Sequence, residues 1–167
     1  MTTAIRPSIR IEALSQAAFA PFGDVVAASG EPDLIINEAR CGRWHDLARL
    51  SAADGRLGLS LFRSAARPLP FELTFVERHR LGSQAFIPLA AEAYLAIVCP
   101  DEAGRPGHPR AFLAANGEGV NYLPGTWHAV LTPLAEQTLF AVIDRISVDG
   151  DEDTEVHEFD TPYRIER

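Results

Sequence analysis

Lysine is absent from the sequence, because all fifteen basic residues are arginine. This absence excludes chemistry that depends on a lysine amine, such as a Schiff base with a carbonyl substrate. Cysteine is scarce: Cys41 and Cys99 are the only two, and they do not form the C-x-x-C pattern of a zinc or redox motif. Two isolated thiols are typical of a reducing compartment, so we predict a cytoplasmic protein.

Long apolar runs and excess positive charge are also missing. No run approaches the ~18 apolar residues of a membrane-spanning helix. The start of the chain, MTTAIRPSIRIEAL, lacks the apolar segment of a targeting peptide. The net charge is -8, and seven of the acids lie between Asp149 and Asp160, so the rest of the chain is nearly neutral. Without a basic surface we expect no nucleic-acid partner, and we expect no membrane partner either.

The length of 167 residues is sufficient for one well-buried core, and we predict a single domain over residues 1–167. From about residue 147 the acidic run and the final TPYRIER are expected to form a C-terminal extension. The spacing of the acids is similar to that of a calcium loop, but Thr154 occupies the position that requires glycine. We therefore interpret the acidic run as a solvated tail.

Short apolar or alternating segments dominate the chain. A helical pattern is confined to LSQAAFAPFGDVV, where Ser15 is the expected N-cap and Gly23 lies just beyond the expected end. Eight later segments have the pattern of β-strands: residues 57–64, 71–79, 84–89, 93–99, 110–115, 119–123, 126–131 and 138–146. Their close spacing predicts an antiparallel sandwich or barrel. No glycine-rich phosphate loop follows any of them, which excludes a Rossmann-type site.

Polar residues end the strand predicted for FELTFVERH. Alternate residues of a strand share one face, so Glu77 and His79 point one way and Arg78 points the other. The turn RLGS then returns the chain, and Gln84 is expected to lie across from this end. A further histidine, His128, lies in GVNYLPGTWH shortly after a turn. The pattern favours a strand that runs from a packed core to the polar mouth of a barrel.

These motifs resemble the cupin family, in which H-x-H is followed by a carboxylate and later by G-x-x-H. Here ERH stands in place of H-x-H, Gln84 stands in place of the carboxylate, and His128 follows Gly125 at the family spacing. The segments ERHRLGSQAFIPL and GVNYLPGTWH, with WHDLARL upstream and VIDR downstream, are similar to the ureidoglycolate lyase family in particular. Family members commonly have WHH where this chain has WHA, and we interpret Ala129 as a change in packing.

The resemblance implies an all-β fold, a cupin double-stranded β-helix or jelly-roll barrel with a short N-terminal helix, assembled as a homodimer. It also implies the elimination of urea from ureidoglycolate to give glyoxylate in allantoin and purine breakdown, with nickel as a possible divalent cofactor. Two alternatives stay open at this point. One is a non-catalytic cupin that binds and senses a small carboxylic acid, and the other is a metal-dependent cupin isomerase or oxygenase.

Urea release needs a general base, a general acid and an anchor for the substrate carboxylate. His79 is our first candidate for the base, with Glu77 as its partner and His128 as a further catalytic residue. Alternatively, a divalent metal would acidify the substrate hydroxyl. The metal-ligand candidates are Glu77, His79, Gln84 and His128, and the substrate-binding candidates are Arg63 for the carboxylate together with Gln84, Asn121, Tyr122 and Trp127.

Overall fold

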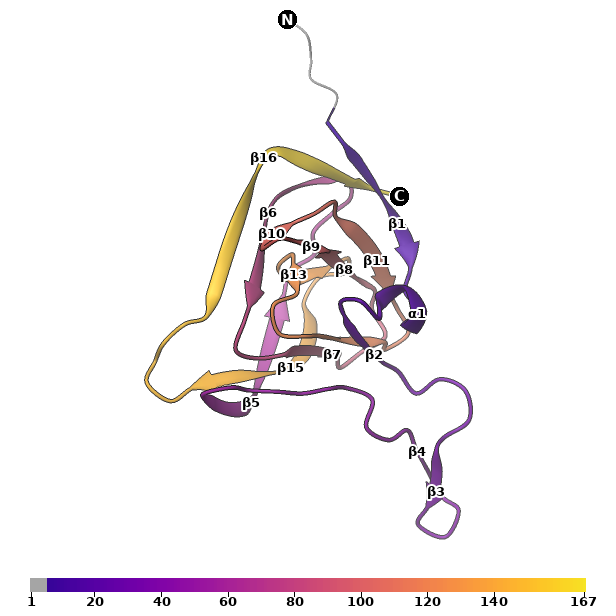
Figure 1. Ribbon diagram of the computed structural model, residues 1–167. Helices are drawn as coiled ribbons and strands as arrows, with labels where there is room; N and C mark the ends of the chain where they lie inside the picture. Colours follow the sequence, from indigo (N-terminus) through magenta and orange to yellow (C-terminus); the bar gives the residue numbers. More distant parts are fainter. Residues whose placement is uncertain (1–5) are drawn as a thin grey trace, which may run out of the picture.

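A computed structural model describes residues 6–167, and within this range the chain is built almost entirely of β-strands (Figure 1). The expected short N-terminal helix is α1 (Gln16–Phe19). The strands are β1 (Ser8–Ala13), β2 (Gly23–Val26), β3 (Leu34–Ile36), β4 (Cys41–Arg43), β5 (Gly55–Ser64), β6 (Phe71–His79), β7 (Gln84–Pro88), β8 (Tyr94–Cys99), β9 (Asp101–Glu102), β10 (Arg105–Pro106), β11 (Arg110–Ala114), β12 (Gly119–Tyr122), β13 (Trp127–His128), β14 (Thr132–Pro133), β15 (Thr138–Ser147) and β16 (Thr154–Glu166). The predicted all-β class is confirmed, and the arrangement is that of a jelly-roll barrel.

All eight predicted strands are present, although the segment at 126–131 contributes only the two residues of β13. Between residues 6 and 167, no helix is long and apolar enough to cross a membrane. The expectation that the chain begins without a targeting segment concerns residues 1–5 in part, and these lie outside the described residues.

The larger sheet closes into a ring. Its strand order is β11-β1-β16-β6-β13-β8-β14, and β11 also pairs with β8 (Figure 1). Each of the six strands in the ring contributes to one apolar cluster, so this cluster fills the ring. Its buried members are Ile9, Leu73, Val76, Leu95, Ile97, Cys99, Ala111, Trp127, Ala129 and Ile165.

A second core lies between β8 and β11 of the ring and the smaller sheet, whose order is β2-β12-β7-β15-β5. The buried members of this core are Phe19, Phe22, Phe86, Tyr94, Ala96, Val98, Phe112, Ala114, Val120, Tyr122, Phe140 and Val142. Alternate residues of β8 therefore belong to the two cores, and all six of its residues are buried. This explains why YLAIVC is a continuous apolar run rather than an alternating one.

The helix α1 is shorter than predicted. Ser15 is the N-cap as expected, because its side chain accepts a hydrogen bond from the backbone N–H of Ala18 at 3.2 Å. The helix ends at Phe19, however, and Gly23 is the first residue of β2 rather than a residue that follows the helix. A Cβ atom on Gly23 would collide with the carbonyl oxygen of Asn121, so glycine allows β2 to approach β12 closely.

The acidic C-terminal run is not the solvated tail that we predicted from its charge. β16 pairs antiparallel with β6 and parallel with β1, so it belongs to the ring. Glu155 accepts hydrogen bonds from the guanidinium groups of Arg78, at 2.9 and 3.0 Å, and of Arg80, at 2.8 Å. The side chain of Arg78 is only 5% exposed, so this carboxylate neutralises a buried positive charge. Three acids of the segment, Asp151, Asp153 and Glu155, therefore lie near arginines of the barrel.

Candidate active site

Four polar side chains, which we call the polar group, lie at the end of β6, the start of β7 and the end of β13: Glu77, His79, Gln84 and His128. In the pairing of β13 with β6, His128 lies directly opposite Glu77. Residues opposite each other on neighbouring strands project from the same face of a sheet. Gln84 is the first residue of β7 and lines a small cavity together with the two histidines.

Two turns hold these strand ends together. Gly125 has a φ angle of 80°, a left-handed conformation that glycine adopts without strain. Its N–H donates to the carbonyl oxygen of His79 at 2.7 Å, which joins the turn before His128 to the end of β6. The turn before β7 is held by the segment that precedes β5, because the N–H of Ser83 donates to the carbonyl oxygen of Ser51 at 3.0 Å.

The ligand-type atoms of Glu77, His79 and His128 lie within 4.8 Å of one another. The centroids of the two imidazole rings are 5.5 Å apart. Nε2 of both histidines and Oε1 of Gln84 are buried, and none has a hydrogen-bond partner among the described residues. Several atoms with lone pairs therefore converge without a donor, which is an unfavourable arrangement unless a proton donor or a cation joins them.

The tautomer of His128 follows from its surroundings. Nδ1 lies 3.0 Å from the carbonyl oxygen of Ala129, which can only accept, so we assign the proton to Nδ1 and the lone pair to Nε2. Burial lowers the pKa of His128 to about 4, so the ring is neutral at pH 7. The ring of Tyr122 stacks on it with the centroids 4.4 Å apart. Burial, and then the nearby charge of Glu77, raise the pKa of Tyr122, so its hydroxyl keeps its proton.

His79 is oriented by β16 and the residue before it. Thr154 pairs with His79 across the strands, and its Oγ1 lies 3.3 Å from Nδ1 of the imidazole. A carboxylate oxygen of Asp153 lies 3.8 Å from the same nitrogen. The carboxylate can only accept, so it favours a proton on Nδ1, and the hydroxyl of Thr154 can accept from the same N–H. We therefore assign the proton of His79 to Nδ1 and the lone pair to Nε2.

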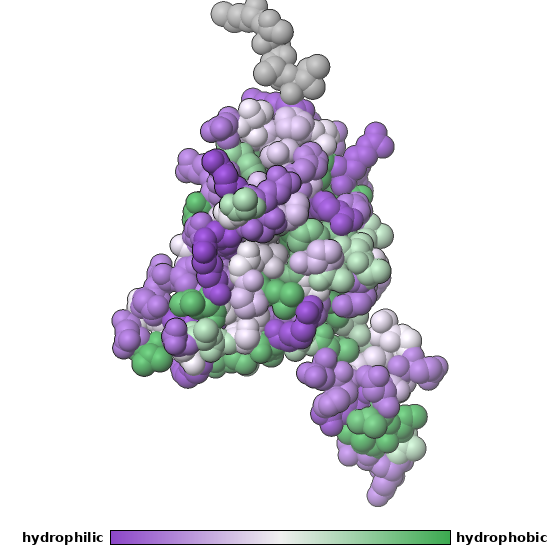
Figure 2. All heavy atoms as spheres, in the orientation of Figure 1, coloured by the Kyte–Doolittle hydropathy of each residue, from purple (hydrophilic) through white to green (hydrophobic). Residues whose placement is uncertain are grey.

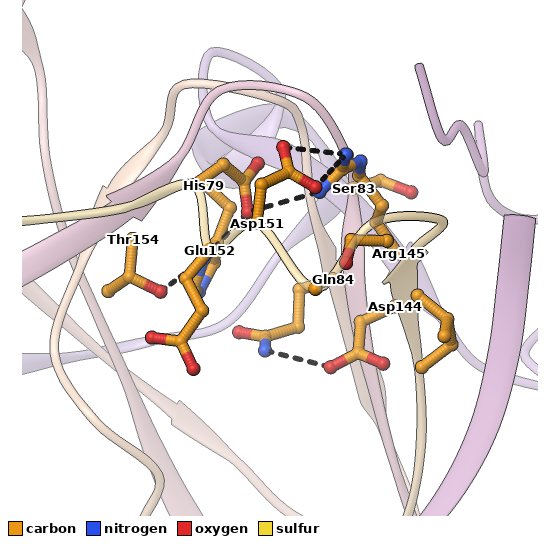
Figure 3. Close-up of a pocket in the computed structure, with 13 residues that line it drawn as sticks. His79, Ser83, Gln84, Asp144, Arg145, Asp151, Glu152 and Thr154 are labelled. Atoms are coloured by element: carbon orange, nitrogen blue, oxygen red, sulfur yellow. Dashed lines mark hydrogen bonds and ion pairs between the residues drawn. The ribbon is translucent and has the colours of Figure 1, made fainter. Parts of the chain in front are cut away.

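A pocket of about 400 Å³ opens beside the polar group, and His79 and Gln84 line it (Figure 3). This volume is within the range of sites for small ligands. Figure 3 shows the side chains of Asp144 and Gln84 joined by a hydrogen bond at one side of the pocket, with His79 and Thr154 at the other. Its remaining lining residues are Gly82, Ser83, Arg145, Ile146, Ser147, Gly150, Asp151, Glu152 and Asp153.

The expected position of Arg63 is corrected by the structure. Arg63 pairs with Leu139 on β15, whereas Gly58 pairs with Asp144, the residue that contacts the polar group. Arg63 is five positions beyond Gly58, which corresponds to ~17 Å along a strand. Within one chain, Arg63 is exposed and does not line the pocket.

Two further predicted side chains face away from the polar group. Asn121 is fully buried, but its Nδ2 donates to Asp24 at 2.9 Å and to the carbonyl oxygen of Arg49 at 3.2 Å. Trp127 belongs to the apolar cluster in the ring, and its Nε1 donates to Asp101 at 3.0 Å. Their strand neighbours Tyr122 and His128 are the ones that face the site, so the predicted positions of Asn121 and Trp127 in the mouth are wrong.

The sequence analysis missed several residues that line the pocket, chiefly Asp144, Arg145, Asp153 and Thr154. A signal for Asp144 exists in TLFAVIDRI: Phe140 and Val142 are buried, and alternation places Asp144 next on the same face. The residues of the acidic run gave no such signal, because their position depends on the pairing of β16 with β6.

The donor set suits a metal ion. Two imidazoles and a carboxylate form a group whose lone pairs could bind a divalent transition metal. The hydrogen bond of His128 to Ala129 and the contact of His79 with Thr154 are the outer partners that usually orient histidine ligands.

Comparisons with known proteins agree on one family. A family model described as ureidoglycolate lyase matches residues 6–166. A ureidoglycolate lyase of Rhodobacter capsulatus is 52% identical over 139 residues, covering 83% of this chain and 86% of that protein. A ureidoglycolate lyase of a Chelativorans species is 47% identical over 158 residues, covering 92% and 93%. Ureidoglycolate lyase 2 of Rhizobium meliloti is 44% identical, covering 93% and 96%.

Proposed function

The chain belongs to the ureidoglycolate lyase family, and from this premise we propose that the polar group is its reactive centre. The protein is a carbon–nitrogen lyase that eliminates urea from ureidoglycolate to give glyoxylate in the degradation of allantoin. The alternative, a sensor of a small carboxylic acid, is not favoured, because the similar proteins are named as lyases.

The observation that carries the proposed site is the convergence of unpartnered lone pairs. Nε2 of His79 and Nε2 of His128 are buried near the carboxylate of Glu77. Oε1 of Gln84 is buried too, and Gln84 lines a small cavity together with both histidines. We propose that the four side chains hold a divalent cation, and the family resemblance implies nickel. Such an ion, when bound, would lower the pKa of a hydroxyl or water that it coordinates.

The charge of the pocket supports a cation as well. Four carboxylates line the pocket, those of Asp144, Asp151, Glu152 and Asp153, and Arg145 provides the only guanidinium among its lining residues. An anionic substrate would be repelled by this set alone. A divalent ion held by the polar group would offset that repulsion.

The reaction moves one proton within the substrate. The hydroxyl loses its proton as the carbonyl of glyoxylate forms, the carbon–nitrogen bond breaks, and the departing nitrogen gains a proton. Because the oxygen and the nitrogen are bonded to the same carbon, one carrier can take the proton and return it. Nε2 of His79 can be that carrier only while no ion occupies it, so the roles of base and ligand that we predicted for His79 exclude each other. With an ion bound, water or a carboxylate of the pocket would carry the proton.

Arg145 replaces Arg63 as the proposed anchor of the substrate carboxylate. Its side chain is 4% exposed, and hydrogen bonds to the carbonyl oxygens of Ala53, at 2.7 Å, and Asp54, at 2.8 Å, fix it. Nη2 also donates to the carboxylate of Asp151 at 3.2 and 3.3 Å, so a substrate carboxylate would compete with Asp151 for this guanidinium. Its Nη1 makes no hydrogen bond among the described residues and lies 4.0 Å from the nearest oxygen of Asp153. We propose that Nη1 donates to the carboxylate of the substrate in the pocket.

Purified protein is expected to convert ureidoglycolate to equimolar urea and glyoxylate, measured by separate assays of the two products. Allantoate, which lacks the hydroxyl that must lose its proton, is the matched control and should not react. Chelator treatment should lower the rate, and added Ni²⁺ should restore it. Absence of urea release both with and without Ni²⁺ would refute the proposed activity.

We also propose that the protein is a homodimer joined through β5 and the β3–β4 hairpin. β5 is an edge strand of the smaller sheet, and its outward leucines Leu59 and Leu61 are 70% and 64% exposed. The hairpin projects from the barrel and carries Ile35, which is 65% exposed (Figures 1 and 2). A long apolar edge strand normally pairs or is covered. Antiparallel pairing of β5 with β5 of a second copy would bury Leu59 and Leu61 of both copies.

Leu59→Glu is expected to dissociate this dimer, because the proposed pairing of β5 would bury the new carboxylate of each copy in an apolar contact. We expect the dimer dissociation constant to rise by ~100-fold or more. Size-exclusion chromatography with light scattering would measure it, with Val156→Glu as the control, because Val156 is 55% exposed on the other sheet. A monomeric wild-type protein at micromolar concentration would contradict the proposal.

We further propose that one domain spans the chain and that the protein is cytoplasmic. The closed ring includes both β1 and β16, which joins the two ends of the described chain in one sheet. Both cysteines, Cys41 and Cys99, are free thiols, as is usual in a reducing compartment.

A further inference from the structure

Asp144 determines which end of the Gln84 carboxamide faces the polar group. Nε2 of Gln84 donates a hydrogen bond to Oδ2 of Asp144 at 3.4 Å. An ionised carboxylate accepts and cannot donate, so the amide nitrogen turns toward Asp144 and the amide oxygen turns away. The oxygen, Oε1, is then buried without a partner, in the small cavity that His79 and His128 also line.

This orientation is not the one that the polar group would select alone. Nε2 of His79 and Nε2 of His128 both carry lone pairs in that cavity, and neither has a donor. If the carboxamide were reversed, its NH₂ group would point toward these nitrogens and could donate to them. The NH₂ group would then lie where a cation would bind, and its positively polarised hydrogens would repel that cation. The carboxylate of Asp144 opposes that reversal.

We propose that Asp144 is a positioning residue, which keeps Oε1 of Gln84 turned toward Glu77 and the two histidines so that this oxygen is the fourth ligand of a divalent cation. The inference rests on the proposed function in one respect, because the cation is the one proposed there. It gives a role to Asp144, a residue of the VIDR motif to which the sequence analysis assigned none.

The local charges explain why a carboxamide can serve at this position. A carboxylate at position 84 would lie beside the carboxylate of Asp144, and two like charges at that distance would repel each other. The carboxamide provides a neutral oxygen on one side and a donor for Asp144 on the other. Asp144 belongs to β15 and Gln84 to β7, and these strands pair from Ala85 and Ile143 onward, so the contact is built into the sheet.

The test is a cycle of substitutions measured by isothermal titration with Ni²⁺ on the full chain after removal of metal by a chelator. Asp144→Ala is expected to weaken Ni²⁺ binding by roughly 10- to 100-fold, which is typical when the outer partner of a ligand is lost. Asp144→Asn can either accept or donate, so it only partly selects the orientation of Gln84 and should give a loss smaller than that of Asp144→Ala. In a Gln84→Glu background, Asp144→Ala should cause no loss, because a carboxylate presents an oxygen in either orientation.

An equal loss from Asp144→Ala in both backgrounds would overturn the inference, because Asp144 would then act through its charge or through folding. Absence of Ni²⁺ binding by the wild type would overturn it too. Asp144→Leu, which keeps a branched side chain and has no acceptor, replaces the alanine variant if that variant does not fold. Urea release is measured on the same preparations: coupled Ni²⁺ binding without urea release would refute the proposed activity and leave the role of Asp144 intact.

Discussion

Replacement of His79 by alanine is expected to abolish nearly all urea release, lowering kcat/KM by roughly 10²- to 10⁴-fold. His79 is the imidazole of the polar group that lines the pocket, and its Nε2 is buried without a hydrogen-bond partner. Its other nitrogen is held by Thr154 at 3.3 Å, so the ring already has the orientation that a ligand or a base needs. The variant should remain folded, because the side chain is 19% exposed and contributes to neither apolar core.

The matched control is His45→Ala, which removes an exposed imidazole outside the pocket and should leave the rate unchanged. Circular dichroism and thermal unfolding of both variants would show that the fold is retained. Titration with Ni²⁺ then separates the two roles of His79. Loss of metal affinity together with turnover indicates a ligand, whereas loss of turnover alone indicates a base. A wild-type rate for His79→Ala would exclude both roles.

The centre of the site could be predicted from the sequence because it depends on local rules. Alternation along FELTFVERH places Glu77 and His79 on one face, and the structure has His128 opposite Glu77 on that face. The positive φ angle of Gly125 explains why a glycine occurs three residues before His128, since the chain must turn there to reach β6.

The same rule, applied to GVNYLPGTWH, would have separated the residues that we placed together. Neighbours on a strand face opposite sides, so Tyr122 and Asn121 cannot both face the mouth, nor can His128 and Trp127. The buried cores decide between the members of each pair: Tyr122 belongs to the core between the sheets, and Trp127 belongs to the ring. Sequence alone does not say which of the two cores each face of a strand meets, because both cores consist of apolar residues.

The contribution of the C-terminal segment could not be predicted from its composition. Seven acids without a basic residue are typical of a solvated tail. Their neutralising partners, such as Arg78, lie 77 positions away in the sequence and become neighbours only when β16 pairs with β6. Thr154 and Asp153 reach His79 through the same pairing. Long-range strand pairing is the information that the sequence patterns lack.

Trp127→Ala is expected to lower the free energy of unfolding by about 3–5 kcal/mol, the usual cost of removing a large aromatic ring from a core. Trp127 is 1% exposed in the apolar cluster of the ring, and the guanidinium of Arg78 lies 4.1 Å from the centroid of its indole. Its Nε1 donates to Asp101 at 3.0 Å. Truncation would remove all three contacts at once. Unfolding by guanidinium chloride at fixed protein concentration would measure the loss, since urea is a product of the reaction.

KM for ureidoglycolate should change little in folded Trp127→Ala, because Trp127 projects away from the polar group. Trp127→Phe is the matched control: it keeps a ring for packing and for the contact with Arg78, loses only the N–H donor to Asp101, and should cost about 1 kcal/mol. The opposite pattern, a tenfold rise in KM with an unchanged free energy of unfolding, would contradict the assignment of Trp127 to the ring. It would instead support the substrate contact that we first predicted from GVNYLPGTWH.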